Sequence, residues 1–276
     1  TDRARKVLPN LVIPEMNGIG AQEICVSTAL GVCDFISAMD TERVPEWNCW
    51  YHLLNCGFPL KVSGETDFPC ISGGRVGQGR VYVQLGHVTA IDFAAWCKGL
   101  AEGRSYVSDG YAQALNFTVG GKTPGTEDVV LKAPDTTTVK ATVAFARSPV
   151  LGTSVGGRVR DADTRSVEVV VNGEVLAAKV VPADGKLHNI EFTIPVKKSS
   201  WVALRCFPQL HTNPVNVLVG GKPIRASKES ALWCRGTIEQ LWRVRQNNIA
   251  PGERAAAKKA FDQAEEIYKK IADECK

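Results

Sequence analysis

The sequence lacks two features that would fix its location in the cell. It has no apolar run long enough to cross a lipid bilayer and no signal peptide, and it opens on Thr1 rather than on Met. We therefore expect no membrane span. Its compartment is unknown, and we expect a soluble protein that is exported only if a signal lies upstream of Thr1.

The nine cysteines include no C-x-x-C pair, which excludes zinc-ribbon and thioredoxin-type sites. Their number is odd and their spacing irregular, so free and mostly buried thiols are expected. Histidine is scarce, with four residues and no two within one helical turn.

The charge balance also lacks a strong sign. Lysine and arginine total 33 against 29 acidic residues, and no basic stripe is interleaved with aromatic side chains. We expect no nucleic-acid partner. A small-molecule substrate is compatible with this composition, and homo-oligomerisation is left open.

Residues 1–111 alternate short apolar strands with helices, which indicates βα units in a mostly parallel sheet or barrel. The expected strands are Leu11–Pro14, Cys33–Ala38, Leu60–Ser63 and Val81–Gln84. The expected helices are Gln22–Leu30, one from Pro45 to Gly57, and one from a Thr89–Asp92 capping box to Gly103.

Residues 112–224 change to short strands separated by glycine, proline and aspartate turns, as in an antiparallel β-sandwich. Asn172-Gly173 predicts a tight hairpin, and Asp184-Gly185 repeats the signal before a strand at His188–Ile194. Residues 225–276 predict a helical hairpin, Glu229–Gln246 and Glu253–Cys275, with Trp233 and Trp242 as packing residues. The fold class expected is α/β plus β.

Active sites in parallel βα folds form at the carboxyl ends of the strands. Four places qualify in this sequence: Glu15 with Asn17, Asp40, Glu65 with Asp67, and Ser108 with Asp109. Carboxylates gathered at such an edge can bind a divalent metal, which supplies hydroxide at neutral pH.

Three segments carry a family resemblance. Pro14–Gly18 (PEMNG) resembles the E-V-x-N-G strand end of the polymerase and histidinol phosphatase (PHP) hydrolases, carbaryl-hydrolase-like (CehA/McbA) branch. Trp50–Phe58 is similar to that branch's W-x-x-L-L-x-x-G helix end, and Gly103–Val107 to its G-R-S-[YF]-V strand. The resemblance implies that the chain is the C-terminal part of a PHP-type βα barrel, followed by the sandwich and the helices.

The resemblance also assigns a metal ligand. In the family loop G-S-D-x-H, Asp and His both bind metal; Asp67 matches the aspartate, and Pro69 stands at the histidine position. The family's opening H-x-H motif is absent from these residues. The resemblance implies zinc, manganese or iron in the intact protein, while metal in this chain alone stays open. The opening on Thr1, just before a motif that comes late in the family, favours a trimmed chain over a degenerate one.

The candidate residues take three roles, each with a structural alternative. Asp67 and Glu15 are the candidate metal ligands, and Asp40 and Glu65 are the candidate catalytic carboxylates. The candidate substrate-binding residues are Asn17, Arg75, Arg80 and Arg104.

The alternatives are ordinary ones. Asp67 and Asn17 can hold turns through their own backbone, Asp40 can pair with Arg43 or cap a helix, and the arginines can be solvated. His52 is expected as a satisfied core histidine, and His211 in a structural role.

Two functions follow. The first is a portion of a metal-dependent hydrolase that uses metal-activated water on an ester, carbamate or phosphoester-like substrate. The second is a non-catalytic β-sandwich module for binding or assembly, attached to a degenerate PHP-like barrel.

Overall fold

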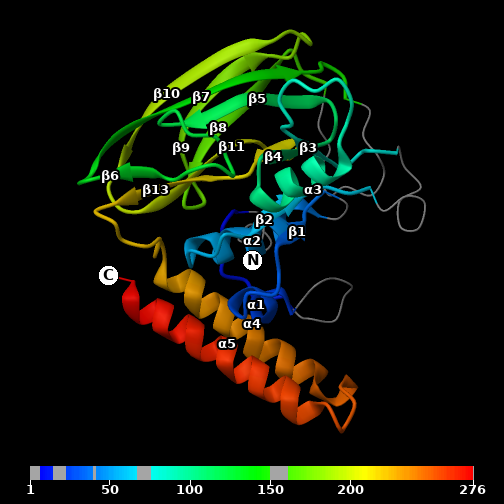
Figure 1. The fold of residues 1–276 in the computed structure, drawn as a ribbon, viewed down its shortest axis with the longest axis vertical. Helices are drawn as coiled ribbons and strands as arrows, with labels where there is room; N and C mark the ends of the chain where they lie inside the picture. The colour runs from blue at the N-terminus through cyan, green and yellow to red at the C-terminus, as the bar shows by residue number, and fades with distance from the viewer. Residues whose placement is uncertain (1–6, 15–22, 40–41, 67–75, 150–160, 276) are drawn as a thin grey trace.

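A computed structural model describes residues 7–14, 23–39, 42–66, 76–149 and 161–275 (Figure 1). Strands gather in one half of the molecule and two long antiparallel helices in the other (Figure 1). Helix α1 (Ile24–Ala29) and helix α2 (Arg43–Asn55) lie between them (Figure 1). Within the described ranges, no helix combines the length and the apolar character needed to cross a bilayer.

One parallel βα unit is present. Strand β1 (Phe35–Ser37) leads through helix α2 (Arg43–Asn55) to strand β2 (Lys61–Ser63), and Phe35 pairs with Lys61 in parallel register. Helix α1 (Ile24–Ala29) precedes β1. These elements confirm the predicted order, and Gly57, at φ 89°, follows α2 as expected.

The next two strands depart from the prediction. Strands β3 (Arg80–Val83) and β4 (Ser105–Ser108) are antiparallel, and β4 pairs with β12 (Leu210–Thr212). β3 and β4 therefore belong to a sheet whose other strands come from residues after 111. This sheet spans the boundary expected between residues 111 and 112. Among the described residues of 1–111, β1 and β2 are the only parallel pair, and a barrel is not shown.

Helix α3 (Phe93–Glu102) connects β3 and β4. Its N-cap is Asp92, whose carboxylate accepts hydrogen bonds from the amides of Ala94 and Ala95, so the capping box expected from Thr89 is wrong by one turn. Gly103 ends α3 in the left-handed conformation, as expected.

Two sheets enclose a shared apolar core, as the sandwich prediction requires. The small sheet has the order β10-β7-β5, with β5 at Ala112–Val119, β7 at Asp135–Phe145 and β10 at His188–Val196. The large sheet has the order β3-β4-β12-β11-β13-β6, and β8 and β9 attach through β11. Its further strands are β6 (Val129–Leu131), β8 (Thr164–Val171), β9 (Glu174–Pro182), β11 (Ser200–Cys206) and β13 (Val215–Val219).

Of the two predicted hairpin turns, one forms a hairpin and the other does not. Asn172 and Gly173 both have positive φ and join β8 to β9, which confirms the first. Asp184-Gly185 joins β9 to β10, but these strands lie in different sheets, so this turn is a crossover and not a hairpin. The pairing of β13 with β6 is parallel, unlike the antiparallel pattern expected.

The C-terminal helical pair is confirmed. Helix α4 (Lys228–Arg245) and helix α5 (Arg254–Glu274) pack along each other, linked by a short 3-10 turn, η2 (Gln246–Asn248) (Figure 1). Trp242 meets Phe261 edge to face at 5.2 Å, so this tryptophan is a packing residue.

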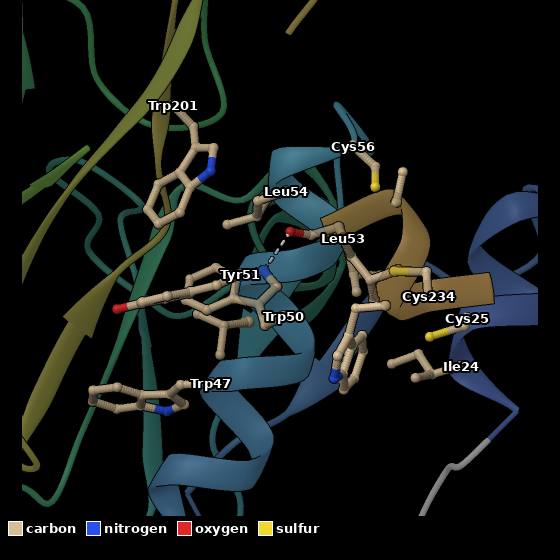
Figure 2. Close-up of a cluster of buried hydrophobic side chains, with 14 of the residues drawn as sticks. Ile24, Cys25, Trp47, Trp50, Tyr51, Leu53, Leu54, Cys56, Trp201 and Cys234 are labelled. Carbon is tan, nitrogen blue, oxygen red and sulfur yellow. Dashed lines mark hydrogen bonds between the residues drawn. The ribbon is translucent and has the colours of Figure 1, made fainter. Parts of the chain in front are cut away.

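Helix α2 joins the helical pair to the sandwich. Its buried side chains Trp50 and Tyr51 lie near Trp201 of β11 (Figure 2). Trp201 donates from Nε1 to Asn55 Oδ1 at 2.8 Å. The segment Leu11–Pro14, expected as a strand, forms no strand with any part of the chain that the structure describes. It runs beside α4, where Trp233 Nε1 donates to the carbonyl of Val12 at 3.1 Å.

Candidate functional site

The carboxyl ends of β1 and β2 meet at one edge, because the two strands are parallel. Ser37 is the last residue of β1, and Glu65 follows the end of β2 by two residues. The Ser37 hydroxyl donates a short hydrogen bond to Glu65 Oε2. The described strand ends thus hold one partly exposed carboxylate, Glu65, with the Ser37 hydroxyl as its hydrogen-bond donor.

Residues 77–79, just before β3, are hydrogen-bonded to the loop at the same edge. Thr66 Oγ1 donates to the Gly79 carbonyl at 3.1 Å and accepts from the Gly77 amide at 2.8 Å. This pair of bonds ties the loop after β2 to residues 77–79.

Close backbone contact at this edge requires two glycines. A Cβ atom at Gly79 would lie 2.1 Å from the Glu65 carbonyl oxygen and 2.6 Å from that of Met39. A Cβ atom at Gly64 would lie 2.6 Å from the Arg80 carbonyl oxygen. None of these three distances is possible between real atoms, so glycine at these two positions lets the three segments meet beside Glu65.

Arg80 lies beside this edge and is held by its own loop. Its Nε donates to the Gly77 carbonyl, and its Nη1 lies 3.4 Å from the Tyr82 hydroxyl. A Cβ atom at Gly110 would lie 2.7 Å from the Arg80 guanidinium carbon, which places the side chain at the end of β4. Arg80 is therefore near the candidate site and already bonded within the fold.

Arg104 is placed elsewhere. It precedes β4, whereas Arg80 pairs with Ser108 at the other end of that strand. Arg104 Nε lies 2.9 Å from Glu102 Oε2 in an ion pair. The structure does not bring Arg104 to the Glu65 edge.

Asp109, at the end of β4, has a structural setting. It is buried, and its carboxylate accepts hydrogen bonds from Gln209 Nε2 at 2.7 Å and from the Tyr111 amide at 2.8 Å. Gln209 Oε1 in turn accepts from Arg165 Nε at 3.0 Å, so Asp109 belongs to a buried polar network of the sandwich.

The remaining candidates fall outside the described residues, namely Glu15, Asn17, Asp40, Asp67 and Arg75. Two of them directly follow residues of the Glu65 edge in the sequence: Asp40 follows Met39, and Asp67 follows Thr66.

The described residues alone do not form a metal centre. Over the described ranges, no group of three or more His, Cys, Asp or Glu side chains is arranged to hold an ion. At the strand ends Glu65 is the one described carboxylate, and one carboxylate is not a complete ligand set. The fit to a metal therefore depends on the candidate ligands Asp67 and Glu15, which lie outside the described residues.

A second polar cluster was not predicted from the sequence. Tyr51 of α2 meets His211 of β12, with 2.6 Å between the hydroxyl and Nε2, and His211 Nδ1 lies 2.7 Å from the Thr212 carbonyl. A carbonyl only accepts, so Nδ1 carries the proton and Nε2 accepts from Tyr51. Arg205 Nη1 also donates to the Tyr51 hydroxyl, at 3.1 Å, and its Nε pairs with Glu168 Oε2 at 2.7 Å.

Burial decides the protonation of this cluster. It lowers the pKa of His211 to about 3 and raises the pKa of Tyr51 to about 12, so both groups are neutral at pH 7. A histidine that stays neutral and fully enclosed joins α2 to the sandwich and does not reach a substrate. This confirms the structural role expected of His211.

His52 is a satisfied core histidine, as predicted. Its Nδ1 lies 2.9 Å from the Ser230 hydroxyl, its Nε2 lies 2.9 Å from the Asn10 carbonyl, and its ring stacks on Trp233 at 4.2 Å. Burial lowers the pKa of His52 to about 4.

One pair in the second cluster, Arg205 with Glu168, follows a general rule of strand pairing. Arg205 and Glu168 lie directly opposite each other on β11 and β8, the position in which opposite charges pair across an antiparallel ladder. Finding that pair requires the register of two strands 37 residues apart, which the sequence pattern does not fix.

No family model, curated protein or solved structure matches the chain.

Proposed function

We propose that this chain is a portion of a metal-dependent hydrolase of the PHP type, with its site at the carboxyl ends of β1 and β2. The observation that carries the proposal is the contact between Ser37 and Glu65 at those ends. It places a carboxylate where parallel βα folds form their active sites, between two stretches that continue into Asp40 and Asp67.

In this proposal the candidate carboxylates have two different roles. Asp67 and Glu15 would hold zinc, manganese or iron, and such a metal would supply hydroxide at neutral pH. Glu65 or Asp40 moves the proton, and the Ser37 bond keeps the Glu65 carboxylate in one orientation. The substrate class is an ester, a carbamate or a phosphoester.

The surroundings of the site support a hydrolase more than an open surface loop. Glycines 64 and 79 allow backbone contact that any side chain would prevent, which holds Glu65 to a single position. Arg80 lies at the same edge and offers a cation for an anionic substrate group, with Arg75 and Asn17 as further candidates. Arg104 stays a prediction that the geometry does not favour.

A second candidate function is binding or assembly by the sandwich, and one observation favours it. Strand β9 pairs only with β8 among the described strands, and its Val175, Leu176 and Val180 side chains are exposed. An apolar edge strand of this kind can accept a strand from another chain.

Metal content separates the two functions. We expect elemental analysis of the purified chain, after loading with zinc, manganese or iron and gel filtration, to find bound metal that is lost in Asp67→Ala. Asp128→Ala, on the sandwich side of the molecule, is the matched control and should retain the metal. Absence of metal from the unmodified chain would instead favour the binding module.

A further inference from the structure

A cleft of about 250 Å³ opens at the amino end of β2, away from the candidate hydrolase site. Lys61, the first residue of β2, lines this cleft, whereas Glu65 follows the other end of the strand. The walls come from the segment between α2 and β2, the end of α3, the turn between β5 and β6, and residues 213–216. Segments far apart in the sequence thus meet around one small hollow.

Glycines bring two of these walls into close contact. A Cβ atom at Gly103 would lie 2.9 Å from Lys61 Cγ, and one at Gly125 would lie 2.4 Å from the Glu102 carbonyl oxygen. Both glycines also have positive φ, which few other residues adopt cheaply. The end of α3 is therefore packed directly against Lys61 on one side and against the turn before β6 on the other.

Asn213, which lines the cleft, fixes the strands next to it. Its side chain is buried, and its Oδ1 accepts a hydrogen bond from the Val62 amide at 2.9 Å. Its Nδ2 donates to the Ser105 hydroxyl at 2.8 Å, so β2 and β4 are tied together beside the cleft. A hollow with walls held in this way is formed before any ligand arrives, as small-molecule sites usually are.

The charges in the cleft leave one cation without a counter-charge. Three carboxylates line the cleft and each has a partner: Glu102 with Arg104, Glu127 with Lys122, and Asp128 with the side-chain amide of Asn216. The ammonium group of Lys61 is half-buried and has no ion pair or hydrogen bond to any described residue. An ammonium group in this setting favours an anionic group beside it, through charge-assisted hydrogen bonds.

Asn216 provides a second polar group, of the opposite kind. Its Nδ2 donates to Asp128 Oδ1 at 3.1 Å, so its own Oδ1 is the atom that can accept. Within the described part of the chain, no hydrogen bond reaches this oxygen. The cleft therefore offers a cation for a carboxylate and an acceptor for a hydroxyl group.

We propose that this cleft binds a small hydroxy acid, whose carboxylate takes the Lys61 ammonium group and whose hydroxyl group donates to Asn216. A ligand of this class satisfies both free groups at once, and the small volume restricts it to a compact molecule. The binding site is independent of the proposed hydrolase, because none of its residues belongs to the Glu65 edge.

Isothermal titration calorimetry of the whole chain, in buffer without divalent metal, tests the proposal. D-Gluconate, L-lactate and acetate share a carboxylate, but gluconate carries several hydroxyl groups, lactate one and acetate none. We expect saturable binding that weakens in this order. D-Glucose, which has hydroxyl groups but no carboxylate, should not bind.

Two variants assign the roles of the two side chains. Lys61→Met keeps an unbranched stem beside Gly103 and should weaken gluconate binding by about 10-fold or more, because a charge-assisted hydrogen bond is lost. Asn216→Ala should weaken gluconate binding and leave acetate binding unchanged. Lys197→Met, at an exposed lysine outside the cleft, is the matched control and should bind gluconate like the unmodified chain.

Thr126→Phe gives a second test that leaves Lys61 in place. Thr126 is exposed and lines the cleft, so a phenyl ring there should obstruct gluconate binding without disturbing the core. Gluconate binding that is unchanged in both Lys61→Met and Thr126→Phe would overturn the proposal. Equal binding of gluconate and glucose, or no binding of any of the three carboxylates to the folded chain, would overturn it as well.

Discussion

Lowering the pH from 6.5 to about 4 is expected to remove on the order of 5 kcal/mol from the free energy of unfolding. His52 and His211 are neutral in the fold because burial lowers their pKa values to about 4 and about 3. In the unfolded chain both bind protons near pH 6.5. Their contribution to stability is therefore complete above pH 6.5 and is lost as the pH falls toward the folded pKa values.

Urea unfolding at several pH values between 6.5 and 5 measures this loss. In this interval each histidine should contribute about 1 kcal/mol per pH unit. His211→Gln should be less stable at pH 7 and should show a shallower slope, whereas His87→Gln, at an exposed position, should keep the slope of the unmodified protein. Equal slopes in all three proteins would refute the assignment of the acid sensitivity to the buried histidines.

Replacing Arg205 with alanine is expected to lower the free energy of unfolding by about 4 kcal/mol. Arg205 is buried and bonds both Glu168 and Tyr51, so its removal leaves a largely enclosed carboxylate without its cation and a buried hydroxyl without one donor. The same change removes one of the links between α2 and the sandwich, because Tyr51 belongs to α2 and Glu168 to β8.

Arg147→Ala is the matched control for this ion pair. Arg147 pairs with Asp163 at 2.9 Å, but both side chains are at least 70% exposed, so its loss should cost less than about 1 kcal/mol. Chemical unfolding of the two variants gives the comparison. Similar costs for Arg205 and Arg147 would mean that the buried cluster does not join the two parts of the fold.

Local signals in the sequence predicted most of the elements. Gly57 and Gly103 take left-handed conformations at helix ends, and Asn172-Gly173 takes positive φ in a hairpin, because few other residues adopt these angles cheaply. The helical pair was also predictable, since α4 keeps a buried apolar stripe that includes Trp233.

Pairing between distant strands was not predictable in the same way. The β3 and β4 sequences suit a parallel or an antiparallel neighbour equally. Only the pairing of β4 with β12 places β4, and β3 beside it, in the large sheet. Asp184-Gly185 has the residues of a hairpin turn, yet β10 finds its partner in β7. A turn fixes local backbone angles but not the sheet that the next strand joins.

The candidate site was predicted in part. Glu65 could be located from the rule that parallel strands end at one edge, and the rule holds because β1 and β2 are parallel. Its hydroxyl partner, Ser37, and the close approach of Gly79 depend on tertiary contacts that no residue pattern indicates. The cluster of Tyr51 and His211 was missed for the same reason, since 160 residues separate them.

The proposed hydrolase function requires Glu65 to act as a catalytic carboxylate at the ends of β1 and β2. The direct test is the rate at which the metal-loaded chain hydrolyses p-nitrophenyl esters and phosphoesters, compared between Glu65→Gln and Glu127→Gln, an exposed control that pairs with Lys122. We predict a fall of about 100-fold or more in Glu65→Gln and no change in the control. Equal rates in both variants, or no hydrolysis by the metal-loaded unmodified chain, would contradict the proposed catalytic role of Glu65.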